Sequence, residues 1–244
     1  MNKIALGTAQ FGLRYGIANE TGRVTLSAAQ NILSLAKENA INVLDTAIAY
    51  GNSEEILGKV GVDGFRVVTK LPPLPEDLNN IASWVTEQVQ GSLGRIGQHK
   101  VYGLLLHRYG DLAGSQGERL VEALEGLKSD GLIQKFGVSI YDPDELDVVC
   151  RKAKIDLVQA PINVVDRRLQ SSGWLDQLKD DGVEVHARSV FLQGLLLMHR
   201  NKIPQKFERW SSRWDEWHDL LKVSGLSPLA LALWFPLMLE QVDQ

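Results

Sequence analysis

Seven short apolar runs rich in Val, Ile and Leu alternate along the chain with segments long enough to form helices. The runs are mostly continuous rather than alternating apolar and polar, which is typical of strands covered on both faces of a parallel sheet. They cover residues 3–8, 41–46, 66–70, 101–107, 134–140, 155–160 and 182–188. Strand after helix after strand gives βαβ units with right-handed crossovers, so the pattern predicts an α/β fold.

The helical segments and the turns between them favour a barrel. Helices are expected at 27–39, 53–60, 77–94, 115–130, 143–152, 167–180 and from about 205 onward. Glycine after Asp130 and after Asp181 can close a helix in the left-handed conformation, and Ser53 and Ser227 stand where helix caps are expected. With no internal linker, residues 1–244 are expected to form a single (β/α)8 TIM-barrel domain.

The strand count falls one short of a closed barrel. An eighth strand and helix would follow residue 240, where only four residues remain. A seven-stranded sheet is expected to expose two edges and part of the barrel interior.

Composition narrows the class of protein. Lys and Arg total 26 against 30 Asp and Glu, without a basic block, which argues against nucleic acid as a partner. A single cysteine, Cys150, excludes an intrachain disulfide, and the five histidines lack metal-ligand spacing. No apolar run approaches membrane-spanning length and no signal peptide is recognised, so a soluble cytoplasmic protein is expected.

Four polar residues stand at or just past the ends of three consecutive strands. They are Asp45, Tyr50, Lys70 and His107. Because a parallel barrel gathers the carboxyl ends of its strands on one face, these side chains are expected to meet there. Each alone has an ordinary structural explanation, but a buried lysine needs a partner. Together the four predict a site for proton transfer.

The chemistry of these side chains suits reduction of a carbonyl. Lys70, or a cationic or hydrogen-bonding His107, would lower the pKa of the Tyr50 phenol from its usual value of about 10. Asp45 would hold Lys70 charged and oriented. A carbonyl oxygen between Tyr50 and His107 would be polarised and protonated as hydride reaches the carbon. Since no side chain supplies hydride, a cofactor is required.

These segments resemble the aldo-keto reductase family. The resemblance is carried by LDTAIAYGNSEEILGK, VVTK, LLLH, GLKSDGLIQKFGVS, DLVQAPINVVDRR and GVEVHARSVFLQGLLL, in order along nearly the whole chain. It implies a barrel that binds NADPH across its C-terminal face. It also implies a catalytic tetrad of Asp45, Tyr50, Lys70 and His107, with Tyr50 as general acid and a small carbonyl compound as substrate.

The resemblance also implies which residues contact the cofactor. Ser139 and Gln159 match contacts to the nicotinamide carboxamide, Gly7 and Thr8 match the stretch passing beneath the ring, and the loop after residue 188 resembles the pyrophosphate-binding segment. The cofactor-binding residues are thus expected to be Gly7, Thr8, Asp45, Ser139, Gln159, Arg188, Ser189, Leu192, Gly194 and Leu195.

Three departures from the family pattern stand out. Ile140 replaces an Asn that usually follows the serine. Arg188 stands where an aromatic residue usually stacks on the nicotinamide; a guanidinium can also stack on a planar ring, or bind a phosphate or a substrate carboxylate. The positions that grip the adenosine 2′-phosphate would lie beyond residue 244, so the preference for NADP over NAD stays open.

Two other functions remain open at this stage. The first is a non-catalytic truncated barrel that binds cofactor weakly or not at all. The second is a lyase or aldolase that uses Lys70 as a Schiff base. Asp45 argues against the second, because a carboxylate keeps the ammonium charged.

Trp210, Trp214 and Trp217 fall on one helical face with Leu221, where core packing is expected.

Overall fold

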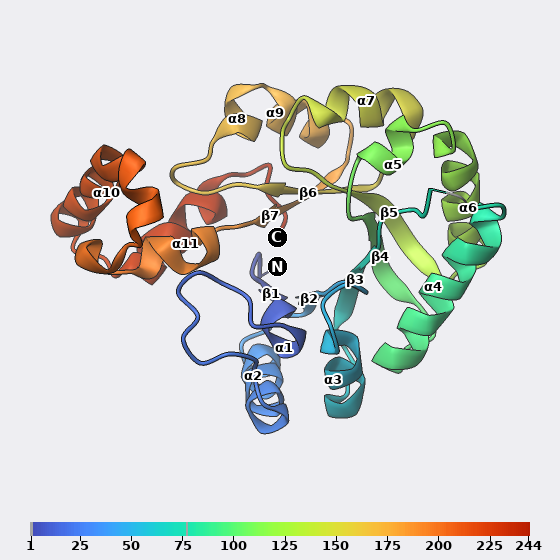
Figure 1. The fold of residues 1–244 in the computed structure, drawn as a ribbon, viewed down its shortest axis with the longest axis horizontal. Coiled ribbons are helices and arrows are strands. Elements are labelled where there is room, and N and C mark those ends of the chain that lie inside the picture. Colours follow the sequence, from blue (N-terminus) through green and yellow to red (C-terminus); the bar gives the residue numbers. More distant parts are fainter. Residues whose placement is uncertain (1, 77) are drawn as a thin grey trace.

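The computed structural model describes residues 2–76 and 78–244, and within them the strands form one parallel sheet. All seven predicted strands are present, in the order β1-β2-β3-β4-β5-β6-β7. Figure 1 shows them curving around the middle of the molecule, with helices outside. The strands are β1 (Ala5–Gly7), β2 (Val43–Asp45), β3 (Arg66–Leu71), β4 (Val101–Leu106), β5 (Ile133–Ser139), β6 (Leu157–Pro161) and β7 (Glu184–Arg188).

Helices cover the outside of the sheet. The predicted helices correspond to α2 (Leu26–Glu38), α3 (Ser53–Val60), α4 (Ile81–Ile96), α6 (Gly117–Ser129) and α7 (Glu145–Lys152). The expected start of α4 at Asp77 lies outside the described residues. In place of the single helix expected over 167–180, the structure has two helices, α8 (Arg168–Ser171) and α9 (Trp174–Asp180). The chain breaks between them because Gly173 has a φ of 83°. Two short helices, α1 (Ala9–Gly12) and α5 (Gly110–Ala113), were not expected from the sequence.

The helix caps follow the turn chemistry with one exception. Gly131 and Gly182 have φ values of 74° and 70°, the left-handed conformation expected after a helix. The hydroxyl of Ser227 accepts from the backbone amide of Ala230, as predicted for a cap. Ser53 is different: Asn52 holds the cap position of α3, and the buried Ser53 hydroxyl instead donates to the carbonyl of Thr8, at 2.9 Å.

The end of the chain lies against β7. Ala187 donates its backbone amide to the carbonyl of Gln244 at 2.8 Å, and Val185 accepts from the amides of Asp243 and Gln244. This is a parallel pairing pattern, and Val242 beside it is buried. The edge of β7 that was expected to be free is therefore partly covered. The sheet still has one strand fewer than a closed (β/α)8 barrel, and Figure 1 shows β1 and β7 as the two ends of its arc.

A second hydrophobic cluster lies to one side of the barrel, where Figure 1 shows α10 (Ser211–Ser224) and α11 (Pro228–Met238). Trp214 and Trp217 are buried in this cluster, as predicted. Their indole N–H groups donate to the carbonyls of Phe207 and Leu196, each at 3.0 Å. The prediction was wrong for Trp210, which is 40% exposed and lies under the guanidinium of Arg209.

In the described part of the chain, no single helix has the length and apolarity to cross a membrane. Residues 205–224 and α11 meet those criteria only as a pair, and the pair is bent by 94° at the break.

Candidate active site

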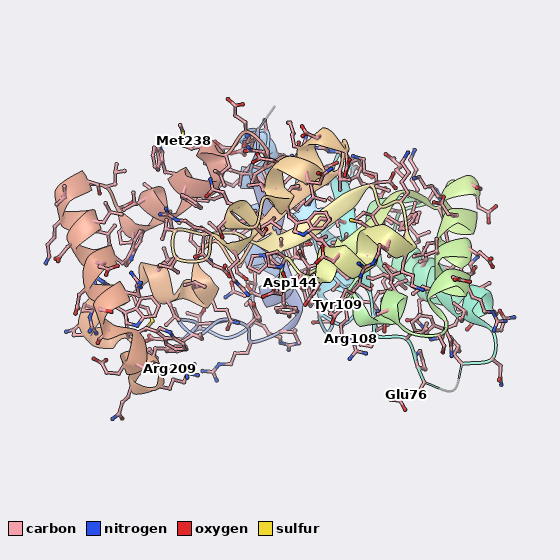
Figure 2. All side chains as sticks on the ribbon, turned by 90° about the horizontal axis from the view of Figure 1, so that it is seen from above. Glu76, Arg108, Tyr109, Asp144, Arg209 and Met238 are labelled. Atoms are coloured by element: carbon pink, nitrogen blue, oxygen red, sulfur yellow. The ribbon has the colours of Figure 1, made fainter. Side chains whose placement is uncertain are left out.

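The loops that follow the strands gather on one side of the molecule. In Figure 2, Glu76 after β3 and Arg108 and Tyr109 after β4 lie toward the same edge, whereas Met238 at the end of α11 lies on the opposite one. Because all strands of the sheet are parallel, their carboxyl ends face this side. This arrangement places the ends of β2, β3 and β4 next to one another.

The centre of the site is an ion pair at the ends of β2 and β3. The Nζ of Lys70 lies 2.6 Å from Oδ1 of Asp45 and donates to the carbonyl oxygen of Thr46 at 2.8 Å. Lys70 is 1% exposed, so burial lowers its pKa while the charge of Asp45 works in the opposite direction. A buried ammonium of this kind depends on the carboxylate beside it.

Tyr50 and His107 complete the group of four. The Nζ of Lys70 lies 5.1 Å from the centre of the Tyr50 ring. The rings of Tyr50 and His107 are 6.0 Å apart between centroids and meet edge to face at 79°. The structure therefore brings together Asp45, Tyr50, Lys70 and His107, which the sequence places in three separate βα units.

The electrostatics of Tyr50 differ from the expectation. The pKa of Tyr50 is raised well above its usual value, chiefly by burial and secondly by the charge of Asp45. The cation that lowers the pKa of Tyr50 is Arg188 rather than the expected Lys70, and burial outweighs it. Burial and the charge of Lys70 together lower the pKa of His107 below 6.5. At neutral pH the site thus holds a protonated phenol and a neutral imidazole.

Gln159 and Ser139 line the same group from neighbouring strands. They are register partners at the carboxyl ends of β6 and β5, and both are buried. The side-chain amide of Gln159 donates to Oδ1 of Asp45 at 2.7 Å, and the Ser139 hydroxyl lies 3.5 Å from Oε1 of Gln159. Thr8, at the end of β1, donates its hydroxyl to the backbone carbonyl of Asp45 at 2.9 Å.

The loop after β7 has an unusual backbone. Ser189, Leu192 and Gln193 have positive φ values of 56°, 47° and 55°, and Gly194 follows with 93°. Non-glycine residues adopt this conformation at a cost, which the surrounding structure must offset, and such residues cluster at ligand sites. The carbonyl of Gln193 accepts from the amides of Ile17 and Ala18, which fixes this loop against the loop after β1.

Two tyrosines and one asparagine near the site were not singled out in the sequence. Burial raises the pKa of Tyr15, with Tyr50 as the second cause, and Tyr141 in turn acts on the titration of Tyr50. Asn163 is fully buried and donates to the carbonyl of Ser189 at 3.1 Å, so it supports the loop after β7. Tyr141 and Asn163 each stand two residues after a strand, which is the signal that would have identified them, whereas Tyr15 lies beyond α1 and carries no such signal.

Gly7, Leu195 and Arg188 lie on strand ends or loops around this group. Gly7 is exposed at the end of β1, and Leu195 is buried in the second hydrophobic cluster. Arg188 ends β7 and stacks over the ring of Tyr141, 4.3 Å from its centroid. Within residues 2–76 and 78–244, no group of three or more His, Cys, Asp or Glu side chains is arranged to hold a metal ion.

Comparison with known proteins places this chain among oxidoreductases and aldo-keto reductases. YqkF of Bacillus subtilis (strain 168), described as an uncharacterized oxidoreductase, is 29% identical over 209 residues, which cover 80% of this chain and 67% of YqkF. The aldo-keto reductase YhdN of the same organism is 26% identical over 208 residues, covering 80% of this chain and 60% of YhdN. The chain thus spans about two thirds of the length of these curated relatives.

Solved structures share the fold. The glycerol dehydrogenase AKR11B4 from Gluconobacter oxydans superposes with a TM-score of 0.73 at 24% identity, over 100% of this chain and 80% of that one. The aldo-keto reductase AKR11C1 from Bacillus halodurans, in its holo form, gives a TM-score of 0.66 at 22% identity, over 83% of this chain and 66% of that one. The model of the Aldo/keto reductase family matches residues 3–243. The chain belongs to the aldo/keto reductase family.

Proposed function

We propose that this chain reduces an aldehyde or ketone to an alcohol, with NADPH as hydride donor and Tyr50 as general acid. The observation that carries the proposal is the packing of Tyr50 between His107 and the Lys70–Asp45 ion pair. The family membership supports oxidoreductase chemistry. The relatives are longer than this chain, so the activity is proposed for this chain rather than transferred to it.

The four side chains have separate roles in protonating the alkoxide that forms. Tyr50 is protonated at neutral pH, since burial and Asp45 raise its pKa further above the usual value of about 10, and it therefore holds the proton when the reaction begins. His107 is neutral and can donate an N–H to the carbonyl oxygen without adding charge. As the carbon accepts hydride, the oxygen takes the proton of Tyr50. Lys70, held by Asp45, packs beside the ring of Tyr50, and the charge of Arg188 is the one that favours the phenolate that is left.

The residues around this group fit a nicotinamide cofactor. NADPH would supply the hydride, which the protein itself cannot provide. Ser139 and Gln159 offer a hydroxyl and an amide at adjacent strand ends beside Asp45, a donor set suited to a carboxamide. The left-handed loop after β7 suits a phosphate-bearing chain. The residues proposed to hold the cofactor are Gly7, Thr8, Asp45, Ser139, Gln159, Arg188, Ser189, Leu192, Gly194 and Leu195.

The Schiff-base alternative fits the structure less well. A lysine nucleophile must be deprotonated and accessible to a carbonyl. Lys70 has the lowered pKa, but it is 1% exposed and bonded to both Asp45 and Thr46. Borohydride trapping of Lys70 with a carbonyl compound would be the direct sign of that chemistry.

The first experiment is a titration of the purified chain with NADPH, followed by tryptophan fluorescence, with NADH in parallel. Saturable micromolar binding is the expected result, and circular dichroism shows whether the chain is folded. Folded chain without binding would favour the non-catalytic alternative. Binding followed by carbonyl turnover that Tyr50→Phe abolishes would support the whole proposal.

A further inference from the structure

Arg188 is held in the site but its hydrogen bonds are incomplete. Its Nη2 donates to the carbonyl of Ile140 at 2.8 Å, and its Nη1 lies 3.2 Å from the hydroxyl of Ser189. One face of the guanidinium stacks on Tyr141. Its Nε is shielded from solvent and has no partner within the described residues. Leaving a charged donor unpaired in this way costs about 1–3 kcal/mol, so a ligand that accepts from it gains that energy back.

Arg188 also lacks a direct counter-ion within the described residues. Its charge acts on Tyr50, Lys70 and His107, so it belongs to the same electrostatic site. Lys70 has Asp45 as its counter-ion. The charge of Arg188 also acts on Asp166 and Glu145, but Asp166 is paired with Arg168, and Glu145 accepts from the backbone amide of Tyr141. The guanidinium is therefore left without a carboxylate bonded to it.

If Arg188 only stacked on the cofactor, its positive charge would have no role in binding. An oxidised nicotinamide ring is itself cationic, so a guanidinium against it would oppose the product state of carbonyl reduction. An anion, by contrast, would balance the charge and occupy the free donor. Arginine is well suited to this because its planar fork matches carboxylate and phosphate oxygens.

We propose that the preferred carbonyl substrate carries an oxyanion, a carboxylate or a phosphate ester, which the guanidinium of Arg188 binds while the carbonyl faces Tyr50. This inference rests on the proposed reductase function and adds the substrate class to it. Arg188 is then the residue that determines specificity, and proton transfer remains with Tyr50.

Matched substrate pairs test this directly. Succinic semialdehyde against butanal differs by a carboxylate, and glycolaldehyde phosphate against glycolaldehyde differs by a phosphate. The wild-type chain is expected to prefer the anionic member of at least one pair. Arg188→Gln is expected to lower kcat/KM for that member about tenfold to a hundredfold more than for its neutral counterpart, mainly through KM. Arg188→Lys should recover part of the loss. Arg213→Gln, which removes an exposed charge from α10, is the control and should change neither.

Two results with these aldehydes would contradict the inference. Equal losses for the charged and neutral aldehydes, together with weaker NADPH binding, would assign Arg188 to the cofactor. No preference in the wild type would exclude an anion site. If the chain binds NADPH but reduces none of these aldehydes, the reductase proposal fails separately. Calorimetry with succinate and inorganic phosphate then decides the role of Arg188: binding lost in Arg188→Gln supports an anion site, and unchanged or absent binding overturns it.

Discussion

The ammonium of Lys70 lies 2.6 Å from a carboxylate oxygen of Asp45, and both groups are held at the ends of neighbouring strands. The same oxygen of Asp45 also accepts from the amide of Gln159 at 2.7 Å. Asp45 therefore balances the charge of Lys70 at the ends of these strands. Lys70 does not lower the pKa of Tyr50. The Lys70–Asp45 ion pair thus has almost no net charge, and it lies buried beside the phenol of Tyr50.

The first prediction follows from this dependence of one charge on the other. Asp45→Asn leaves a buried ammonium without its counter-ion and is expected to cost about 3 kcal/mol or more in the free energy of unfolding. The double variant Asp45→Asn/Lys70→Met removes both charges and should recover part of the loss. Urea denaturation of the two single variants and the double variant measures the coupling. Simple additivity of the single effects would show that the ion pair contributes no coupled stability.

Removing the Tyr50 hydroxyl should separate chemistry from binding. Tyr50→Phe is expected to lower kcat for carbonyl reduction by about a hundredfold to ten-thousandfold, the usual range for loss of a general acid. The dissociation constant for NADPH should stay within about twofold, because the ring and its packing are kept. Tyr109→Phe, the same change just after His107, is the matched control. Unchanged turnover in Tyr50→Phe would assign the proton to another group.

The pH dependence of reduction follows from the directions of the two pKa shifts. The pKa of Tyr50 is raised above 10, so the acid is lost only as the pH rises beyond that value. The pKa of His107 is lowered below 6.5, so the imidazole becomes charged only below that pH. We expect kcat/KM for a neutral aldehyde to be flat between these limits. A titration with its midpoint between about pH 7 and 9 would contradict the assignment of either group.

The positions of the strands and of the four polar residues were predictable because one rule connects them. Continuous apolar runs identify buried parallel strands, and parallel strands bring Asp45, Lys70 and His107 to one face. The resemblance to the family added Arg188 and Ser189 as residues to examine. No distances were needed for these predictions.

What the sequence did not predict depends on burial or on contacts between distant segments. The raised pKa of Tyr50 follows from how much of the phenol is buried, which motif spacing does not contain. Ser53 forms a hydrogen bond with Thr8, 45 positions away, rather than capping its own helix. Trp210 follows the helical spacing of Trp214 and Trp217 but lies before the first residue of α10, and its side chain is 40% exposed. The pairing of Gln244 with Ala187 depends on the curvature of the whole sheet.

The loop after β7 is expected to be sensitive at Gly194. A Cβ there would lie 2.5 Å from the Cβ of Ala18, and the φ of 93° is unfavourable for any other residue. Gly194→Ala should therefore shift the loop, weaken NADPH binding and lower the unfolding free energy by roughly 1 kcal/mol or more. Ala18→Gly in the same chain removes the clash but not the backbone strain, so it should recover only part of the binding. Full recovery would mean that the clash alone matters, and no effect of Gly194→Ala would show that NADPH does not depend on this loop.

The last prediction concerns acid stability and a network within the strands, away from the tetrad. Burial raises the pKa of Glu184, but hydrogen bonds from His186, Lys135 and Tyr102 outweigh it and hold the pKa at about 2. Because the folded pKa lies below the unfolded value of about 4.5, the stabilisation is present above pH 4.5 and is lost as the pH falls toward 2.

Glu184→Gln should therefore reduce stability near neutral pH by roughly 2 kcal/mol and make the loss of stability in acid less steep. Asp219→Asn is the control, because the pKa of Asp219 is also lowered, by Lys222, but at a fully exposed site. Thermal unfolding followed from pH 7 to pH 2 compares the three proteins. If the stability of Glu184→Gln falls with pH in parallel with that of the wild type, the Glu184 carboxylate is not the group whose protonation destabilises the barrel. The interior network would then contribute through packing rather than through charge.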